Sequence, residues 1–240
     1  AAADELEHIS FKVEKGQTLA IIGATGSGKT TLASLIPRFY DATAGTVLVD
    51  GLDVREYTFD ALYNKLGYVT QKAVLFSGTV EDNVFFGQSA AEKTDASLQA
   101  ALSLSQAAEF VDKYPEKAAH PIAQLGRNVS GGQKQRLSIA RALARTPEIL
   151  IFDDSFSALD YKTDATLREG LAKELPDTTK IIVAQRISTI RNADQILVLD
   201  RGEIAGLGTH DALMASCTVY REIAMSQLSE EELKKGGASK

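Results

Sequence analysis

The octapeptide GATGSGKT, Gly23 to Thr30, has the residue types and spacing that suit phosphate binding. It matches the pattern G-x-x-x-x-G-K-[ST], follows the apolar run TLAIIG, and opens a segment of helical composition. Its glycines let successive backbone N–H groups point inward, and the helix N-terminus adds positive potential. Lys29 is placed to reach the β- and γ-phosphates of a nucleotide. The predicted binding residues are Gly23, Ala24, Thr25, Gly26, Ser27, Gly28, Lys29, Thr30 and Thr31.

Two adjacent aspartates, Asp153 and Asp154, end the apolar run ILIF. A buried strand that ends on acids delivers carboxylates to the edge of a sheet. A phosphate-binding loop needs such an acid to hold Mg²⁺, usually through water, and Asp153 is placed to serve, with the Thr30 hydroxyl as a further metal ligand. The alternatives are that Asp153 only caps the strand exit and that the glycine-rich loop fits its pattern by chance.

A third motif, VSGGQKQRLSIARAL from Val129 to Leu143, resembles the signature motif of ATP-binding cassette (ABC) proteins. Beside it, YVTQ ending at Gln71 resembles the Q-loop, and SALD ending at Asp160 resembles the D-loop. The segment LFSGTVEDNVFFG is similar to the one that follows the Q-loop in exporter-type cassettes. The resemblance covers nearly the whole chain and implies an ATPase with ATP and Mg²⁺ as its cofactors.

The resemblance also implies a second phosphate grip in the same chain. Ser130 can cap the helix that follows, while Gly131 and Gly132 expose N–H groups at its positive end. In the family, this segment closes over ATP bound to another cassette, head to tail. An amphipathic helix with a glycine start is the alternative. The further assignments are Gln133 and Asp160 for the nucleotide, Thr30, Gln71 and Asp153 for the metal, and Asp154, Gln185 and Gln71 for catalysis.

The sequence departs from the family at both catalytic positions. Family members carry a glutamate after the metal-linked aspartate, and here Asp154 is one methylene shorter, which should place a base poorly. They also carry a histidine where this chain has Gln185, and glutamine cannot become cationic. A milder departure is Gln124, where many exporters have an acid before the signature. Together these changes resemble the degenerate half of a heterodimeric exporter.

The elements that must position these residues alternate between strand and helix. We expect an α/β fold, a P-loop NTPase core with a mostly parallel sheet, in one cassette over residues 1–240. Segments 6–17 and 45–54 alternate in polarity and predict an N-terminal antiparallel β layer. Residues of about 80–147 read as a helical subdomain inserted in the core, and about 228–240 as a frayed tail.

Composition restricts the function classes. A net charge of −6 argues against nucleic-acid binding, and the single cysteine, Cys217, fits a reducing compartment. The sequence has no apolar run of transmembrane length and no signal peptide. Family cassettes stack adenine on an aromatic residue upstream of anything present here. We therefore expect the chain to begin inside its domain, behind a membrane domain in the same polypeptide that docks near residues 71–86, where Leu75 and Phe76 could line a groove or be ordinary core.

The leading hypothesis is an exporter cassette at the cytoplasmic face of the cell membrane, slow at its own site, that works with a competent partner cassette. A homodimeric exporter with weak ATPase at both sites is the second hypothesis. A soluble ABC ATPase acting on DNA or ribosomes is a third, and importers remain a minor alternative.

Overall fold

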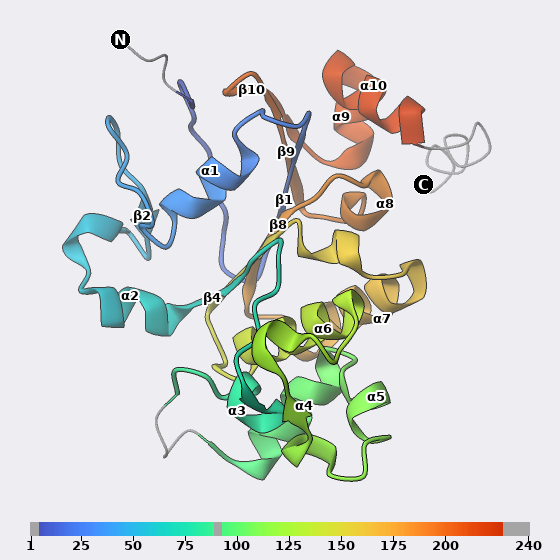
Figure 1. The fold of residues 1–240 in the computed structure, drawn as a ribbon. Coiled ribbons are helices and arrows are strands. Elements are labelled where there is room, and N and C mark those ends of the chain that lie inside the picture. The colour runs from blue at the N-terminus through green and yellow to red at the C-terminus, as the bar shows by residue number, and fades with distance from the viewer. Residues whose placement is uncertain (1–4, 89–92, 228–240) are drawn as a thin grey trace. The chain divides into compact units, whose positions relative to one another are not determined.

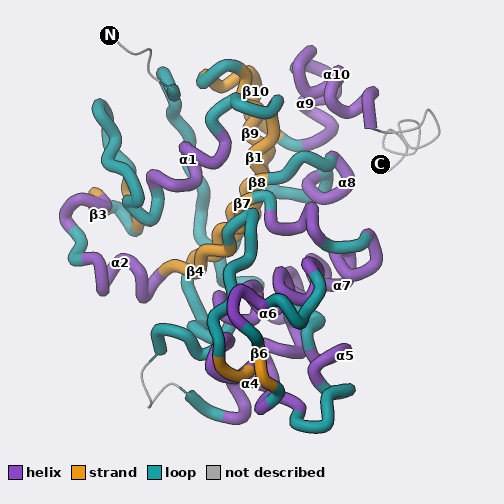
Figure 2. The backbone as a smooth tube through the Cα atoms, in the orientation of Figure 1, coloured by secondary structure: helices purple, strands orange, loops and turns teal. Residues whose placement is uncertain are grey.

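The structure is a computed structural model that describes residues 5–88 and 93–227. It divides into two compact units, residues 1–63 with 179–240 and residues 64–178. Figure 1 colours the chain from its N-terminus to its C-terminus, and Figure 2 separates helices from strands and loops. The predicted tail falls on residues 228–240, which lie outside the described residues.

The first unit is built on a sheet in which β8, β1 and β9 run parallel and β10 pairs antiparallel with β9 (Figure 1). Its elements are β1 (Thr18–Gly23), α1 (Lys29–Leu35), β2 (Leu48–Val49), β3 (Leu52–Asp53), β8 (Thr179–Val183), α8 (Ile187–Ile190), β9 (Gln195–Asp200), β10 (Glu203–Gly208), α9 (His210–Ser216) and α10 (Thr218–Gln227). The apolar strands β1 and β9 are buried along their centres, which is typical of a parallel sheet covered on both faces.

The second unit pairs β4 with β7 in parallel and carries helices that pack on one another. Helix α2 (Phe59–Lys65) leads into it from the first unit. Its elements are β4 (Leu66–Val69), β5 (Gly78–Thr79), α3 (Val80–Val84), α4 (Asp95–Leu104), α5 (Ala108–Val111), β6 (Pro121–Ile122), α6 (Gly131–Leu143), β7 (Ile149–Asp153) and α7 (Tyr161–Glu174). Helices α3 and α4 both contact α6, so α6 is the centre of this helical group. The predicted α/β class with a mostly parallel sheet is confirmed.

The predicted N-terminal β layer is wrong in its first strand. Residues 5–17 form no strand, and the layer is reduced to the short antiparallel pair β2 and β3. Glu7 N–H donates to the Gly202 carbonyl at 2.9 Å, but no ladder continues from it along residues 5–17. Alternating polarity alone does not make a strand, because each extended residue also needs a neighbouring backbone to satisfy its N–H and C=O groups.

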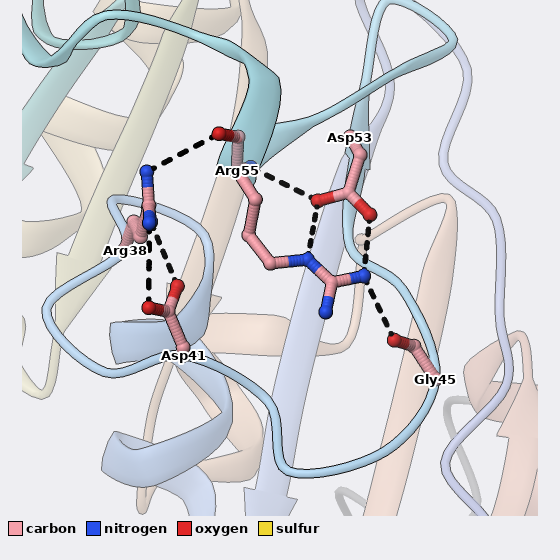
Figure 3. A network of polar contacts seen from close by, with 5 residues as sticks. All are labelled: Arg38, Asp41, Gly45, Asp53 and Arg55. Carbon is pink, nitrogen blue, oxygen red and sulfur yellow. Dashed lines mark hydrogen bonds and ion pairs between the residues drawn. The ribbon is translucent and has the colours of Figure 1, made fainter.

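The β2–β3 hairpin is braced by arginine side chains (Figure 3). Arg55 donates to both carboxylate oxygens of Asp53, at 3.0 and 2.7 Å, and to the Gly45 carbonyl at 3.3 Å. Arg38 binds Asp41 in the same way and reaches the Arg55 carbonyl. The hydrogen bonds from Arg55 lower the pKa of Asp53 to about 2. This carboxylate therefore remains ionised across the pH range in which most proteins are folded.

Candidate nucleotide site

The phosphate-binding loop connects β1 to α1 in the first unit. Gly26 and Gly28 have φ angles of 80° and 96°, in the region that favours glycine. At Gly23 a Cβ atom would collide with the Leu199 carbonyl oxygen, since β1 and β9 pair closely there. Glycine is thus required at these positions by the backbone path itself, and the loop curls as the sequence motif predicts.

Lys29 and Thr31 make contacts within the first unit. The Lys29 ammonium donates to the Gly23 and Ala24 carbonyl oxygens at 2.9 and 2.8 Å, which places its charge across the loop. The Thr31 hydroxyl donates to the Glu5 carboxylate at 2.5 Å. The structure therefore places Lys29 where a phosphate in the loop would meet its charge, whereas Thr31 is engaged by the N-terminal segment.

Ser27 is the one loop residue whose polar atom is left orphaned. Its side chain is only 3% exposed, and its hydroxyl oxygen has no hydrogen-bond partner in the part of the chain that the structure describes. A buried hydroxyl without a hydrogen-bond partner costs folding free energy, and a bound ligand is one explanation for such a group. The residues of the loop thus fit a phosphate group, with backbone N–H groups, the Lys29 ammonium and an orphaned hydroxyl as its partners.

Gln185 lies at the same edge of the sheet as this loop. Strand β8 pairs with β1 in the register Val183 to Ile21, and Ala184 N–H continues the ladder to the Ile21 carbonyl at 3.1 Å. Both strands run in the same direction, so Gln185 leaves β8 where Gly23 leaves β1. The structure therefore places Gln185 beside the loop within one unit, and its assignment to the γ-phosphate stays a prediction.

In the second unit, the two aspartates sit at the carboxyl end of β7 and are 5% and 6% exposed. The Tyr68 hydroxyl donates to Asp153 at 3.2 Å, and the Gln71 side-chain amide donates to Asp154 at 2.8 Å. Strands β4 and β7 are parallel neighbours, which brings Gln71 from the end of one strand to the end of the other. The structure thus joins two of the predicted catalytic residues, Gln71 and Asp154, by a direct hydrogen bond.

The backbone at Asp154 is unusual. Its φ is 48°, in the left-handed region that a non-glycine residue enters at some cost, and the Ser157 hydroxyl donates to its carbonyl at 2.7 Å. The neighbouring Ser155 hydroxyl is buried and has no partner among the described residues. Strained backbone and an orphaned polar group at the end of a strand are features that concentrate at functional sites.

The signature segment forms the N-terminus of α6. Ser130 and Gln133 make a capping box, with Ser130 N–H donating to the Gln133 side chain at 2.8 Å and Gln133 N–H donating to the Ser130 hydroxyl at 3.3 Å. A Cβ atom added to Gly131 would meet no atom of the described residues within 4 Å, and one added to Gly132 would make only an ordinary contact there, with the Ala158 carbonyl. Packing inside this chain therefore does not explain the two glycines.

Asp160 of the SALD segment caps α7. Its carboxylate accepts from the Thr163 N–H at 2.9 Å and from the Thr163 hydroxyl at 2.8 Å. These bonds lower the pKa of the Asp160 carboxyl. The residue that the family resemblance assigned to the nucleotide thus also has a local structural role.

Sequence reasoning missed Tyr68 and Gln135. Gln135 is 1% exposed on α6 and donates to the Thr70 carbonyl at 3.1 Å, so the signature helix supports the backbone next to Gln71. A long polar side chain on the buried face of an amphipathic helix was the available signal for Gln135. Tyr68 gave no signal, because a tyrosine in a strand ordinarily packs as core.

An exposed aromatic pair follows Gln71 in the second unit. Phe76 and Phe86 stack with ring centroids 4.3 Å apart and are 43% and 50% exposed. The Arg141 guanidinium lies over both rings and donates to the Val74 carbonyl at 3.0 Å. Leu75, which the sequence offered as a groove residue, is fully buried. It is core because it faces inward between two exposed neighbours.

Together the fold and these sites define an α/β protein with a nucleotide-binding P-loop. The sequence pattern of the ABC transporter family matches residues 6–157. An ABC transporter ATP-binding protein of Mycobacterium tuberculosis is 49% identical over 223 residues, 92% of this chain and 38% of that protein. An ATP-dependent lipid A-core flippase of Syntrophus aciditrophicus is 40% identical over 228 residues, 95% of this chain and 38% of that protein.

Among solved structures, a bacterial Atm1-family ABC exporter with ATP bound matches with a TM-score of 0.89 and 37% identity, over 94% of this chain and 40% of that chain. The chain belongs to the ABC transporter family and is a P-loop ATPase domain of that family. It spans well under half the length of these relatives. No helix within residues 5–88 and 93–227 is long and apolar enough to cross a membrane.

Proposed function

We propose that this chain is the nucleotide-binding cassette of an exporter, that it dimerises head to tail around Mg-ATP, and that its own site hydrolyses ATP slowly. The observation that carries the dimer is the N-terminus of α6. A side chain at Gly131 would meet no atom of the described residues, so the glycine is not needed for packing. The P-loop, which would bind this chain's own ATP, lies on a different segment, before α1. Packing among the described residues does not require the glycines of this second phosphate-binding segment. They are accounted for if the segment contacts ATP that is bound to another cassette.

Slow hydrolysis follows from the two residues at the catalytic positions. Asp154 is a shorter base than glutamate, and the Gln71 amide holds its carboxylate at 2.8 Å. Gln185 can donate a hydrogen bond to a γ-phosphate but cannot bring a positive charge to it. Because a misplacement of about 1 Å can cost on the order of 10²-fold in rate, the shorter side chain alone can make the site slow. A partner cassette with glutamate and histidine at these positions would then supply the faster site.

Mg²⁺ would be held by the Thr30 hydroxyl, the Gln71 amide oxygen and Asp153 through water, together with the phosphates. No cluster of three histidine, cysteine, aspartate or glutamate residues that could hold a metal occurs among the described residues. A site completed by hydroxyl, amide and phosphate oxygens suits magnesium, which prefers few protein ligands. The ion would neutralise charge on the phosphates, while Asp154 would orient the attacking water.

Transport requires a membrane domain, and Phe76 and Phe86 are the residues we propose for its contact. An exposed stacked pair that also contacts the Arg141 guanidinium is a preformed apolar surface, and it follows Gln71 in the chain. The cassette would then lie at the cytoplasmic face of the membrane, and movement at Gln71 on ATP binding would reach this surface. The relatives that this chain matches are longer proteins, which leaves room for such a domain.

The test is steady-state Mg-ATP hydrolysis by the 240-residue chain and by its Asp154→Glu, Gln185→His double variant over a range of protein concentrations. We expect a nearly inert parent and a double variant whose activity rises faster than linearly with concentration. Equal turnover by the two proteins would contradict the slow-site proposal and favour a homodimeric exporter with two working sites. Activity that stays linear in concentration would contradict the dimer.

A further inference from the structure

The segment that carries Gln185 turns sharply after β8. Ala184 still bonds to β1, whereas Ile187 begins α8, so the chain changes direction across Gln185 and Arg186. Gln185 is exposed and Ile187 is fully buried. The first N–H of a helix has no partner inside that helix, and the α8 cap residue, Arg186, provides no side-chain cap. Something else must satisfy the buried Ile187 N–H and fix the turn.

Gln227, at the end of α10, bonds to the backbone on both sides of this turn. Its side-chain oxygen accepts from the Ile187 N–H at 2.9 Å, and its side-chain nitrogen donates to the Gln185 carbonyl at 2.7 Å. The amide therefore spans the turn on both sides of Arg186, although Gln227 lies some forty residues further along the chain. Helix α10 also packs against α8 and β9, which fixes the point from which the side chain reaches.

Only a primary amide of this length can make the pair of bonds. Glutamate would keep an acceptor for the Ile187 N–H but would set a carboxylate against the Gln185 carbonyl, since it has no N–H to donate. Asparagine is one methylene shorter. The bond to Ile187 stabilises the start of α8, whereas the bond to Gln185 fixes the residue that the proposed function assigns to the γ-phosphate.

We propose that Gln227 is a positioning residue of the nucleotide site, and that it holds Gln185 in place to sense the γ-phosphate of ATP. The inference rests on the proposed function, because it presupposes that Gln185 contacts that phosphate. It adds the C-terminal helix α10 to the ATP site, a part of the chain that no motif connects with nucleotide binding.

The experiment compares the affinity of the 240-residue chain for Mg-ADP and for a non-hydrolysable Mg-ATP analogue, by calorimetry at concentrations where the chain is monomeric. The variants are Gln227→Ala, Gln227→Glu and Gln185→Ala, with Ser226→Ala as the matched control. Ser226 lies one residue earlier on α10, and among the described residues its hydroxyl bonds within its own helix, to the Ile223 carbonyl. Thermal unfolding of each variant reports on its stability.

We expect Gln227→Glu to weaken binding of the ATP analogue roughly five- to tenfold, the effect of a misplaced hydrogen bond to a charged group, with ADP affinity unchanged. Its thermal stability should fall, because the carboxylate faces the Gln185 carbonyl. Gln227→Ala should show the same selective loss of affinity for the ATP analogue, with a lower thermal stability because the buried Ile187 N–H loses its acceptor. Combining it with Gln185→Ala should weaken analogue binding no further. The Ser226→Ala control should match the parent.

Two results would overturn the inference in different ways. If Gln185→Ala loses preference for the ATP analogue while both Gln227 variants keep it, Gln227 does not position Gln185, and the proposed function stands. If the parent itself does not distinguish the analogue from ADP, or Gln185→Ala binds both as the parent does, the assignment of Gln185 to the γ-phosphate fails, and the inference fails with it. An equal loss for both nucleotides in the Gln227 variants would reduce Gln227 to a structural role.

Discussion

At the scale of single residues, the site is marked by groups that the rest of the chain leaves unexplained. Among the described residues, the buried Ser27 hydroxyl has no hydrogen-bond partner, and no atom would obstruct a side chain at Gly131. Stability within the chain accounts for neither, because an orphaned buried hydroxyl is unfavourable and alanine is a better helix former than glycine. A ligand that approaches these atoms would account for both.

Replacement of Ser27 by alanine tests the first of these groups. We expect the ligand-free chain to be unchanged or more stable, by up to about 1 kcal/mol, because the variant removes an unsatisfied buried hydroxyl. Affinity for Mg-ATP should fall, since a donor to the phosphate is lost. Urea unfolding and nucleotide titration measure the two effects. The control is Ser34→Ala, because the buried Ser34 hydroxyl donates to the Thr30 carbonyl at 2.7 Å. That control should lose stability, and a similar loss in Ser27→Ala would contradict the prediction.

Replacement of Gly131 by aspartate tests the second. The side chain has space in the monomer, and an acid in the first turn of a helix is favourable by about 0.3–1 kcal/mol, so thermal stability should hold or rise. Hydrolysis by the Asp154→Glu, Gln185→His background should nevertheless be lost, because the carboxylate would face the partner's γ-phosphate. Full activity of this variant in the same assay would show that the signature segment does not contact ATP.

At the scale of elements, the sequence predicts the strands and helices that have the strongest local patterns. Strands β1 and β7 lie on the apolar runs TLAIIG and ILIF, and helix α6 begins after Ser130 as the signature segment predicts. The predicted strand over residues 6–17 fails, because polarity patterns carry no information about whether a neighbouring strand is present. Within the segment predicted to be helical, α4 and α5 are separate helices, because Gln106 takes a φ of 62° between them.

Contacts between distant elements are also beyond what sequence patterns predict. The sequence assigns a role to Gln185 because it follows an apolar strand in a segment that resembles a family motif, whereas Gln227 bonds across some forty residues and belongs to no motif. Tyr68 and Gln135 support the site in the same way. Residues that touch a ligand leave patterns at fixed spacing, and residues that hold those residues in place do not.

A histidine in the helix pair α9 and α10 predicts that the stability of the chain depends on pH. His210 on α9 and the fully buried Tyr220 on α10 share a hydrogen bond of 2.8 Å between the ring nitrogen and the hydroxyl. Burial, with a smaller contribution from the Arg191 charge, lowers the pKa of His210 below 6.5, while Asp211 opposes this shift. The unfolded chain therefore binds the proton first, so stability from this group is complete above pH 6.5 and is lost as pH falls from there toward the folded pKa.

Thermal unfolding between pH 7.5 and pH 5 measures this effect, with the pH values chosen to bracket the usual histidine pKa of about 6.5. The parent should lose stability on acidification, and His210→Gln should show a smaller change. The exposed His8 offers a control, His8→Gln, that should follow the parent. If the thermal stability of His210→Gln falls with pH as steeply as that of the parent, His210 is not the source of the pH dependence.

At the scale of the whole molecule, the proposed function requires two chains, because the P-loop and the signature of one chain are to serve different ATP molecules. In a two-fold dimer, each P-loop meets the partner's signature, and the two contacts are equivalent by symmetry. A chain whose P-loop is inactivated should therefore still contribute its signature segment to the ATP site of a partner. A chain that uses its own two motifs on one nucleotide could not do so.

Complementation decides between these arrangements. In the Asp154→Glu, Gln185→His background, Lys29→Ala removes the ammonium that spans the loop, and Gly131→Asp blocks the signature, so each variant alone should be inactive. In an equimolar mixture half of the dimers are mixed, and each has one intact site, which predicts roughly a quarter of the activity of the background protein. The double variant Lys29→Ala, Gly131→Asp, mixed in the same way with either single variant, is the control and should restore nothing. If the first mixture is also silent, while each variant still unfolds cooperatively, the P-loop and signature do not meet between chains, and the head-to-tail dimer is wrong.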